Sequence, residues 1–185
     1  KHMIGLIRPD RGRVYFHGQE ISSMDEHALV PVRRRMGFLF QGGALFDSMT
    51  VTQNIIFPME EHGVGSAEER IRRSHEVLAM VGLDGFGDRL PEKLSGGQQK
   101  RVALARAIVL NPEVIFYDEP TTGLDPIRAD LINELILKLQ LVLGNTAVVV
   151  THDMTSARKV GNRIVMLDKG VFIADTTPDK LDDID

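Results

Sequence analysis

The sequence predicts an α/β protein built on a mostly parallel sheet, and three neighbouring segments support this prediction. Val114–Tyr117 and Ala147–Val150 are apolar at every position, which is typical of strands buried on both faces. The segment between them has apolar side chains at helical spacing. A strand, a helix and a second strand at this spacing form a βαβ unit, in which helices cover a parallel sheet.

The helix of this unit has clear boundaries. Asp125 can act as its N-cap, Pro126 suits its first turn, and Gly144 can end it. Its apolar side chains recur on one face: Ile127, Leu131, Leu135 and Leu139.

The other elements follow from apolar periodicity and from the positions of Gly and Pro. Lys1–Ile7 resembles the end of a helix, because Pro9 and a following turn stop it. The acidic residues at the end of the sequence are expected to form a frayed helix. We expect strands at Val14–Phe16 and Met36–Phe40, helices within Thr50–Leu83 and at Gln98–Leu110, and a hairpin of Ile164–Leu167 and Val171–Ala174 around Lys169-Gly170.

The expected organisation is one partial domain over residues 1–185. Residues 1–41 and 95–185 form its α/β core, and residues 42–94 form a mostly helical insert. We find no internal repeat that would divide the chain further.

The composition limits the possible classes of function. The chain has no cysteine, which excludes disulfides, thiolate metal sites and a cysteine nucleophile, and is compatible with a reducing cytosol. No apolar run approaches the roughly 18–20 residues that cross a bilayer. The net charge is −4, and the arginines of 33–35 and 70–73 are expected to be solvated. Without interleaved aromatic residues they argue against a nucleic-acid partner.

Two carboxylates follow the strand Val114–Tyr117 directly. Asp118 and Glu119 stand at the carboxyl end of a parallel strand, where open α/β sheets bind their ligands. Asp118 is suited to hold Mg²⁺ through water, and Glu119 is placed to polarise a water aligned on a γ-phosphorus. An acidic strand end is common, but the attached segment Pro120–Asp125 favours function here.

A glycine pair begins the helix at Gln98–Leu110. Ser95 can cap this helix, while Gly96 and Gly97 let backbone amides approach an anion closely. The helix dipole adds positive potential, so the helix start suits a γ-phosphate. The complete run from Leu94 to Gln98 is far more specific than the glycine pair alone.

Two further polar residues follow predicted strands. His152 comes after the strand Ala147–Val150, so it can lie at the same sheet edge as Asp118 and bind a phosphate oxygen or orient the attacking water. Gln41 ends the strand Met36–Phe40 before a flexible Gly42-Gly43, and we expect it to act as a neutral ligand of magnesium or water.

These features favour a protein that binds a nucleoside triphosphate and magnesium, yet the 185 residues contain no G-x-x-x-x-G-K-[ST] pattern. That pattern supplies the amides and the lysine that hold the β- and γ-phosphates.

Taken in order, the motifs resemble the nucleotide-binding domain of ATP-binding-cassette (ABC) proteins over nearly the whole chain. The matches are Gln41 to the Q-loop, Leu94–Gln98 to the signature, Val114–Asp118 to the Walker B strand, Glu119 to the catalytic glutamate, Gly123–Asp125 to the D-loop and His152 to the switch histidine.

This resemblance implies an α/β fold of the P-loop NTPase type, with ATP and Mg²⁺ as cofactors. Two copies would face head to tail, so that ATP lies between the phosphate loop of one copy and the signature of the other. The residues of this chain that contribute to ATP binding would then be Gln41, Ser95, Gly96, Gly97, Gln98 and Asp125. Hydrolysis would drive a membrane partner.

A finer resemblance is to the ATPase of bacterial lipid-asymmetry (Mla-type) phospholipid transporters. It rests on Gln41–Val51 with Asn54, Ile55 and Pro58, and on Leu141–Gly144 with Val148–Met154. Many proteobacterial members carry a methionine in the signature where this chain has Gln98-Gln99. The resemblance implies phospholipid transport, a peripheral location at the cytoplasmic face of the inner membrane, and a permease subunit that docks on residues 42–94.

Members of the family begin with two or three strands and the phosphate loop, ahead of the helix whose remainder Lys1–Ile7 resembles. We therefore expect an N-terminally truncated copy that neither binds ATP tightly nor hydrolyses it alone. We also expect apolar edges beside the Val114 and Ala147 strands, with poor solubility or partner pairing as the result.

Two other classes of function remain open. A soluble cassette ATPase acting on ribosomes or DNA usually has two cassettes or a long coiled coil between Q-loop and signature, whereas about fifty residues without heptads separate them here. A non-catalytic module would instead complete the ATP site of a partner with its signature.

Overall fold

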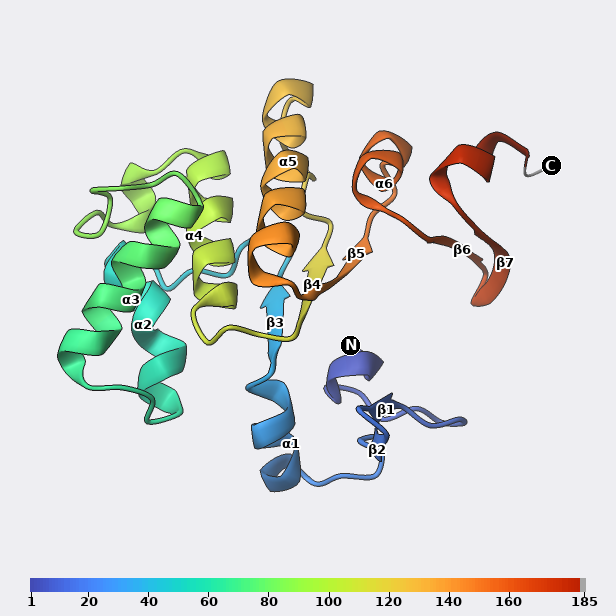
Figure 1. Cartoon of the computed structure of the whole chain (residues 1–185), viewed down its shortest axis with the longest axis horizontal. Helices are drawn as coiled ribbons and strands as arrows, with labels where there is room; N and C mark the ends of the chain where they lie inside the picture. Colours follow the sequence, from blue (N-terminus) through green and yellow to red (C-terminus); the bar gives the residue numbers. More distant parts are fainter. Residues whose placement is uncertain (184–185) are drawn as a thin grey trace.

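The computed structural model describes residues 1–183, and its centre is a parallel sheet. The sheet consists of β3 (Met36–Leu39), β4 (Val114–Asp118) and β5 (Thr146–Val150), in the order β3-β4-β5. Met36 lies opposite Val114, and Val114 lies opposite Thr146. The predicted α/β class with a parallel core is therefore confirmed, and β3 and β4 point toward the same edge (Figure 1).

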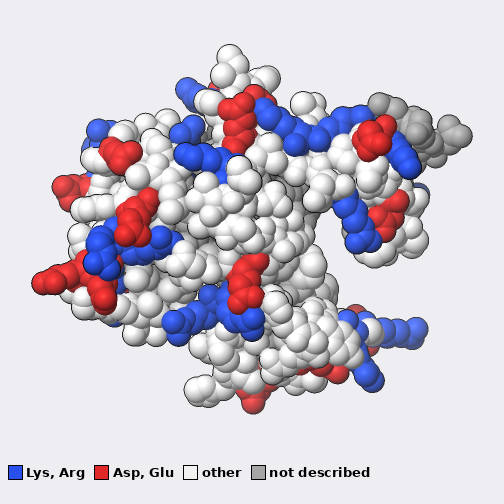
Figure 2. All heavy atoms as spheres, in the orientation of Figure 1, with Lys and Arg blue, Asp and Glu red and all other residues white. Residues whose placement is uncertain are grey.

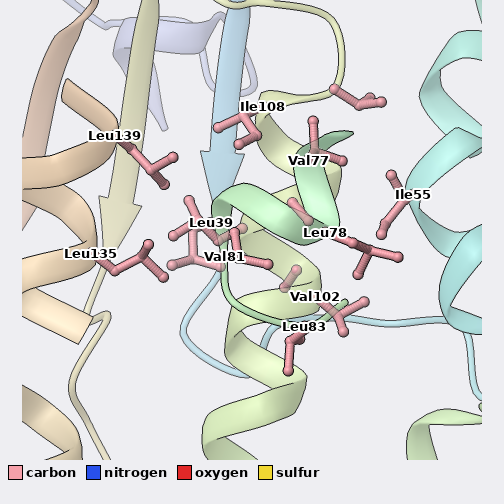
Figure 3. Close-up of a cluster of buried hydrophobic side chains, with 14 of the residues drawn as sticks. Leu39, Ile55, Val77, Leu78, Val81, Leu83, Val102, Ile108, Leu135 and Leu139 are labelled. Carbon is pink, nitrogen blue, oxygen red and sulfur yellow. The ribbon is translucent and has the colours of Figure 1, made fainter. Parts of the chain in front are cut away.

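The helices α4 (Gly96–Ile108) and α5 (Pro126–Leu143) cover one face of this sheet. The helices α2 (Val51–Glu61) and α3 (Ala67–Met80) pack on α4 and extend the same core. Ile115 and Tyr117 of β4 point into the core that these helices share with the sheet. Figure 3 shows that side chains from β3, α2, α3, α4 and α5 pack together in this core.

The opposite face of the sheet has a thinner cover. Val114 and Phe116 of β4 pack there against Ile4 of the 3₁₀ helix η1 (His2–Ile4). A short antiparallel ribbon of β1 (Tyr15–Phe16) and β2 (Gln19–Glu20) and the helix α1 (Glu26–Arg33) lie nearby. The segment Lys1–Ile7, which the sequence suggested was the end of a helix, is this 3₁₀ turn followed by a left-handed Gly5.

The carboxyl-terminal part begins with α6 (Met154–Val160). The predicted hairpin is confirmed as β6 (Ile164–Asp168) paired antiparallel with β7 (Val171–Thr176). The 3₁₀ helices η2 (Pro91–Lys93) and η3 (Pro178–Asp183) complete the elements of residues 1–183. The expected frayed helix at the end falls partly on residues 184–185, which lie outside the described residues.

Two helical regions differ from the sequence prediction. The helical segment Thr50–Leu83 is two helices, since the left-handed Gly63 and Gly65 separate α2 from α3. Helix α1 was not predicted, although Asp25 caps it by accepting a hydrogen bond from the amide of Ala28 at 2.8 Å.

The apolar face of α5 is also displaced from its predicted position. Leu135 and Leu139 are buried as expected, but Ile127 is 76% exposed and Leu131 is 43% exposed. The start of α5 extends past the end of β4, so its first turns have no sheet beneath them (Figure 1). The residues that complete the buried face are instead Ile132 and Ile136.

The strand β5 is less buried than an all-apolar strand predicts. Val150 is 54% exposed, and β5 pairs with β4 on one side while no other described strand pairs with its outer edge. The expected free apolar edge is therefore present beside the Ala147 strand. It is absent beside the Val114 strand, because β4 has a neighbour on each side.

Two arginines that were expected to be solvated instead satisfy backbone carbonyl groups. Arg33 donates to the carbonyl oxygens of Ile4 at 3.0 Å and Gly5 at 2.8 Å. Arg73 donates to those of Ile108 at 3.3 Å and Val109 at 3.1 Å. Both sets of carbonyls lie at helix ends, where helical bonding leaves acceptors free. Figure 2 shows basic and acidic side chains interspersed over the face that it draws.

Within residues 1–183, no helix combines the length and the apolar character that a membrane span requires.

Candidate functional site

The polar residues that follow the three central strands lie at one edge of the sheet. Gln41 comes shortly after β3, Asp118 is the last residue of β4, and His152 comes shortly after β5. Because the strands are parallel, their carboxyl ends meet at the same edge, which is the usual ligand-binding edge of an open α/β sheet. The fold thus places at one edge of the sheet the residues that the sequence singled out as metal and catalytic candidates.

Glu119 is held in a strained backbone conformation at this edge. Its φ is +50°, a left-handed value that costs a residue with a Cβ about 1 kcal/mol or more. Its amide continues the ladder of β4 and donates to the carbonyl oxygen of Val150 at 2.9 Å. Such strain persists only where the surrounding structure fixes it, so the direction of the Glu119 side chain is closely determined.

Both carboxylate oxygens of Glu119 have hydrogen-bond partners. Nδ1 of His152 lies 2.8 Å from Oε1, and the Thr122 hydroxyl donates to Oε2 at 3.0 Å. The Glu119 side chain is largely covered, whereas the His152 side chain is 78% exposed. The pair therefore joins the loop after β4 to the loop after β5 and leaves the other face of the imidazole open to a ligand.

Each member of this pair stabilises the charged form of the other. Burial raises the pKa of Glu119, but the hydrogen bonds from His152 and Thr122 outweigh it, so the net shift is downward from 4.5. The hydrogen bond to Glu119 and the negative charge of that residue raise the pKa of His152 above 6.5. The His152–Glu119 contact is consequently an ion pair over the pH range between these two pKa values.

The turn that carries His152 is fixed by a buried polar network. Asp153 caps α6 by accepting from the amide of Thr155 at 3.0 Å, and the Ser156 hydroxyl donates to Asp153 Oδ2 at 2.7 Å. Asn133 of α5 donates to the Ser156 oxygen at 2.9 Å. Ser156 and Asn133 are both buried, so this network anchors the His152 turn to α5.

The start of α4 has a complete capping box. The Ser95 oxygen accepts from the amide of Gln98 at 3.4 Å, and Gln98 Oε1 accepts from the amide of Ser95 at 2.9 Å. Ser95 and Gln98 therefore satisfy each other. Gly96 and Gly97 occupy the first two helical positions, and a Cβ built on either meets no described atom within 4 Å. Packing does not require glycine here, whereas close approach of a ligand would.

Asp125 has a local role of its own. It caps α5 by accepting from the amide of Arg128 at 3.0 Å, and its carboxylate pairs with the Arg128 guanidinium at 3.2 Å. The starts of α4 and α5 lie at the same end of the molecule as the carboxyl ends of β3 and β4 (Figure 1).

Comparison with known proteins identifies the family. Residues 1–122 match the family model described as ABC transporter. This chain belongs to the ABC transporter family. A similar curated protein is the methionine import ATP-binding protein MetN of Brucella melitensis, which is 42% identical over 168 residues, 91% of this chain and 45% of MetN. The probable ribonucleotide transport ATP-binding protein mkl of Mycobacterium tuberculosis is 41% identical, over 90% of this chain and 46% of mkl.

Solved structures agree with this assignment. The chain superposes on the dimeric ABC transporter cassette MJ0796 with a TM-score of 0.86 and 38% identity, covering 96% of this chain and 78% of that one. It superposes on cbiO1 of Clostridium perfringens, part of the ABC transporter complex cbiONQ, with a TM-score of 0.88 and 29% identity, covering 98% and 72%. The chain spans about half the length of the curated relatives it matches.

The donor chemistry at this edge of the sheet fits magnesium. Asp118 and Gln41 offer carboxylate and amide oxygens, which Mg²⁺ prefers. Among the described residues no group of three or more His, Cys, Asp or Glu side chains could hold a metal by itself. Since magnesium keeps several waters and binds substrate phosphates, a site with so few protein ligands suits Mg²⁺ accompanying a nucleotide better than a structural metal.

The structure also reveals supporting residues that sequence reasoning missed. Arg106 of α4 donates to the carbonyl oxygens of Gly43 and Ala44, both at 2.8 Å, so the loop after Gln41 is less free than its glycines suggest. Asn54 of α2, which is fully buried, donates to the carbonyl oxygens of Phe46 and Met49 in the same loop. The sequence signal for this role was Asn54 itself, a polar residue at a position where the helix pattern expects an apolar one.

Proposed function

We propose that this chain is part of an ATP-hydrolysing subunit that energises an ABC transporter. The observation that supports the proposal best is the Glu119 carboxylate, held by His152 and Thr122 beside Asp118 at the ligand-binding edge of the sheet. A carboxylate in this position can accept a proton from water that attacks a γ-phosphorus, while His152 orients that water or a phosphate oxygen.

Asp118 and Gln41 are the residues that would hold Mg²⁺, which supplies positive charge to the phosphate oxygens when it is bound. Gly96 and Gly97 would donate their amides to a γ-phosphate, with the dipole of α4 behind them. Ser95, Gln98 and Asp125 would line the same nucleotide, since they lie at the starts of α4 and α5.

We propose that the functional unit contains two copies of this domain. In that arrangement the signature of one copy and the Glu119 edge of the other face the same ATP. The structure of MJ0796 is described as dimeric, and a second structure of that protein as a dimer bound to ADP and Pi, which supports a paired arrangement here.

The 185 residues contain no phosphate loop, and we propose that they bind ATP weakly and do not hydrolyse it by themselves. The loop's amides and lysine are the main electrostatic clamp on the β- and γ-phosphates in P-loop proteins. The residues present supply the signature, the magnesium ligands and the candidate base, so they can still complete a site in a partner that carries the loop.

A groove of about 460 Å³ is the surface we propose for docking to a transmembrane permease subunit. The rings of Phe46 and Phe57 lie 4.8 Å apart along it, and those of Phe38 and Phe40 lie 4.2 Å apart. The aromatic side chains give the groove an apolar lining, so an apolar helical segment would fit it. Helix α2 of the proposed insert 42–94 borders it through Phe57 and Pro58.

Phospholipid is the substrate class we propose, and its support is the resemblance of Gln41–Val51 and Val148–Met154 to the lipid-asymmetry transporters. The names of similar proteins point to other solutes, namely methionine, ribonucleotides and glycine betaine or carnitine. The corresponding location is the cytoplasmic face of a bacterial inner membrane. In this family the membrane and periplasmic partners select the solute, so reconstitution with a permease distinguishes these substrates.

The proposal is tested by ATP turnover in three polypeptides. The first is the 185-residue chain. The second is an extended form in which the phosphate-loop segment of Brucella MetN precedes Lys1, and the third is the extended form with Glu119→Gln. We expect turnover only in the second. Equal turnover in the second and third would refute the role of Glu119, and turnover by the first would refute the need for the loop.

A further inference from the structure

One side chain connects the helix that follows the signature to the loop that follows Glu119. Lys100 lies in the second turn of α4, and its Nζ donates to the carbonyl oxygens of Pro120 at 2.9 Å and Thr122 at 2.7 Å. These two carbonyls belong to the loop that follows Glu119. The ammonium group is partly buried, and this burial lowers the pKa of Lys100, while the nearby Glu119 opposes the shift.

The loop that Lys100 contacts also fixes the orientation of the Glu119 side chain. The Thr122 hydroxyl bonds to the Glu119 carboxylate, and the Thr122 amide donates to the Glu119 carbonyl oxygen at 3.3 Å. Glu119 itself is strained, with a φ of +50°. A contact that fixes the carbonyls of Pro120 and Thr122 therefore also fixes the conformation from which Glu119 projects.

The other end of the connection is the start of α4. Lys100 comes four residues after Gly96, so about one helical turn separates the two and they share a face of the helix. A helical turn closed by a capping box is rigid over that distance. The Lys100 side chain therefore forms a direct link between the helix that begins with Gly96 and Gly97 and the Pro120 and Thr122 carbonyls.

We propose that Lys100 is a positioning residue that couples the signature helix to the Glu119 loop. This inference rests on the proposed function, in which the signature and Glu119 of one chain serve two different ATP sites. Lys100 then couples these two sites. When nucleotide contacts the signature at one site, the orientation of the Glu119 carboxylate at the other site changes.

The test uses amide hydrogen exchange and imidazole ¹⁵N spectra of the 185-residue chain, neither of which needs ATP. In Lys100→Met we expect the Glu119 and Thr122 amides to exchange at least about tenfold faster, because bonds from a charged donor are lost. The ¹⁵N signals of His152 should shift as well, since its bond to Glu119 loosens. Lys100→Arg keeps the charge and donors and should retain most of the protection.

Lys138→Met is the matched control, because Lys138 also donates to a backbone carbonyl, that of Met80 at 3.4 Å. It should leave both readouts unchanged. Unaltered exchange and unaltered His152 signals in Lys100→Met would overturn the proposal. If Lys100→Met fails to fold, Lys100→Gln takes its place, and unaltered exchange of the Glu119 and Thr122 amides in that folded variant would overturn the proposal.

Coupling itself is tested by a double-mutant cycle with Ser95→Ala, which removes the cap of α4. In the parent chain this substitution should speed exchange of the Thr122 amide, and in the Lys100→Met background it should have no further effect. An equal effect in both backgrounds would show that Lys100 does not transmit the change. Absence of ATPase in every form of the protein would contradict the proposed function but leave these readouts intact.

Discussion

At the scale of single residues, the Glu119–His152 pair determines the electrostatics of the site. The pair is fully charged only between the lowered pKa of Glu119 and the raised pKa of His152. Its contribution to stability is lost as the pH falls through the pKa of Glu119, and also as the pH rises through the pKa of His152. The pH interval from 4.5 to 6.5, the ordinary pKa values of the two groups, therefore lies inside the window in which the pair is intact.

Glu119→Gln should lower the pKa of His152 toward 6.5, because it removes both the charged acceptor and its negative potential. NMR titration of the His152 ring carbons measures this pKa directly. Glu134→Gln is the control, since Glu134 pairs with Lys159 instead. A His152 pKa that stays at the same raised value in Glu119→Gln would mean that another group causes the shift.

At the scale of elements, α4 organises the site. Its start presents Gly96 and Gly97, its second turn contacts the Glu119 loop through Lys100, and its last turns hold the loop after Gln41 through Arg106. Burial lowers the pKa of Arg106, yet its two bonds to the Gly43 and Ala44 carbonyls satisfy the guanidinium. One helix therefore sets the positions of three sequence motifs.

Arg106→Met should destabilise the folded chain by about 2–3 kcal/mol, because hydrogen bonds from a charged donor to two backbone carbonyls are lost. Urea unfolding followed by far-UV circular dichroism measures this difference. Arg101→Met, which removes a single bond to the Val81 carbonyl at 3.1 Å, should cost less. Equal costs for the two substitutions would contradict a special role for Arg106 in the Gln41 loop.

The sequence predicted correctly those features that depend on residues close together in the chain. Asp125, Pro126 and Gly144 bound α5 because capping and chain stops depend on neighbouring residues. Helix α1 was missed because Pro31 and a run of arginines obscure its pattern. The contacts made by Lys100 and Arg106 could not be predicted, since a long cationic side chain gives no sequence sign of which distant carbonyl it will reach.

At the scale of the whole molecule, the sheet has one well-covered face and one exposed side. A pocket of about 550 Å³, lined by Phe16, Val148 and neighbouring residues, lies between the amino-terminal ribbon and the sheet. Figure 2 shows a hollow between the amino-terminal and carboxyl-terminal parts on this side. Val150 on β5 and Phe172 on the hairpin, which is 74% exposed, add apolar surface. Exposed apolar strands with an open edge promote association between chains.

The chain should therefore self-associate as its concentration rises, and Val150→Lys should reduce this association by placing a charge at the open edge. Sedimentation equilibrium gives the weight-average mass for both forms. Thr146→Lys changes an exposed residue at the other end of β5 that is already polar, and it should have a smaller effect. A parent chain that remains monomeric at every accessible concentration would contradict the expectation.

The central claim is that the signature of one copy and the Glu119 edge of another share one ATP. It is tested most directly by ATP turnover in a mixture of the extended form carrying Ser95→Arg with the 185-residue chain. We predict that neither polypeptide turns over ATP alone, that turnover rises as the 185-residue chain is added, and that the same chain with Ser95→Arg gives no rise. No rise in turnover from a mixture shown to form heterodimers would contradict the account.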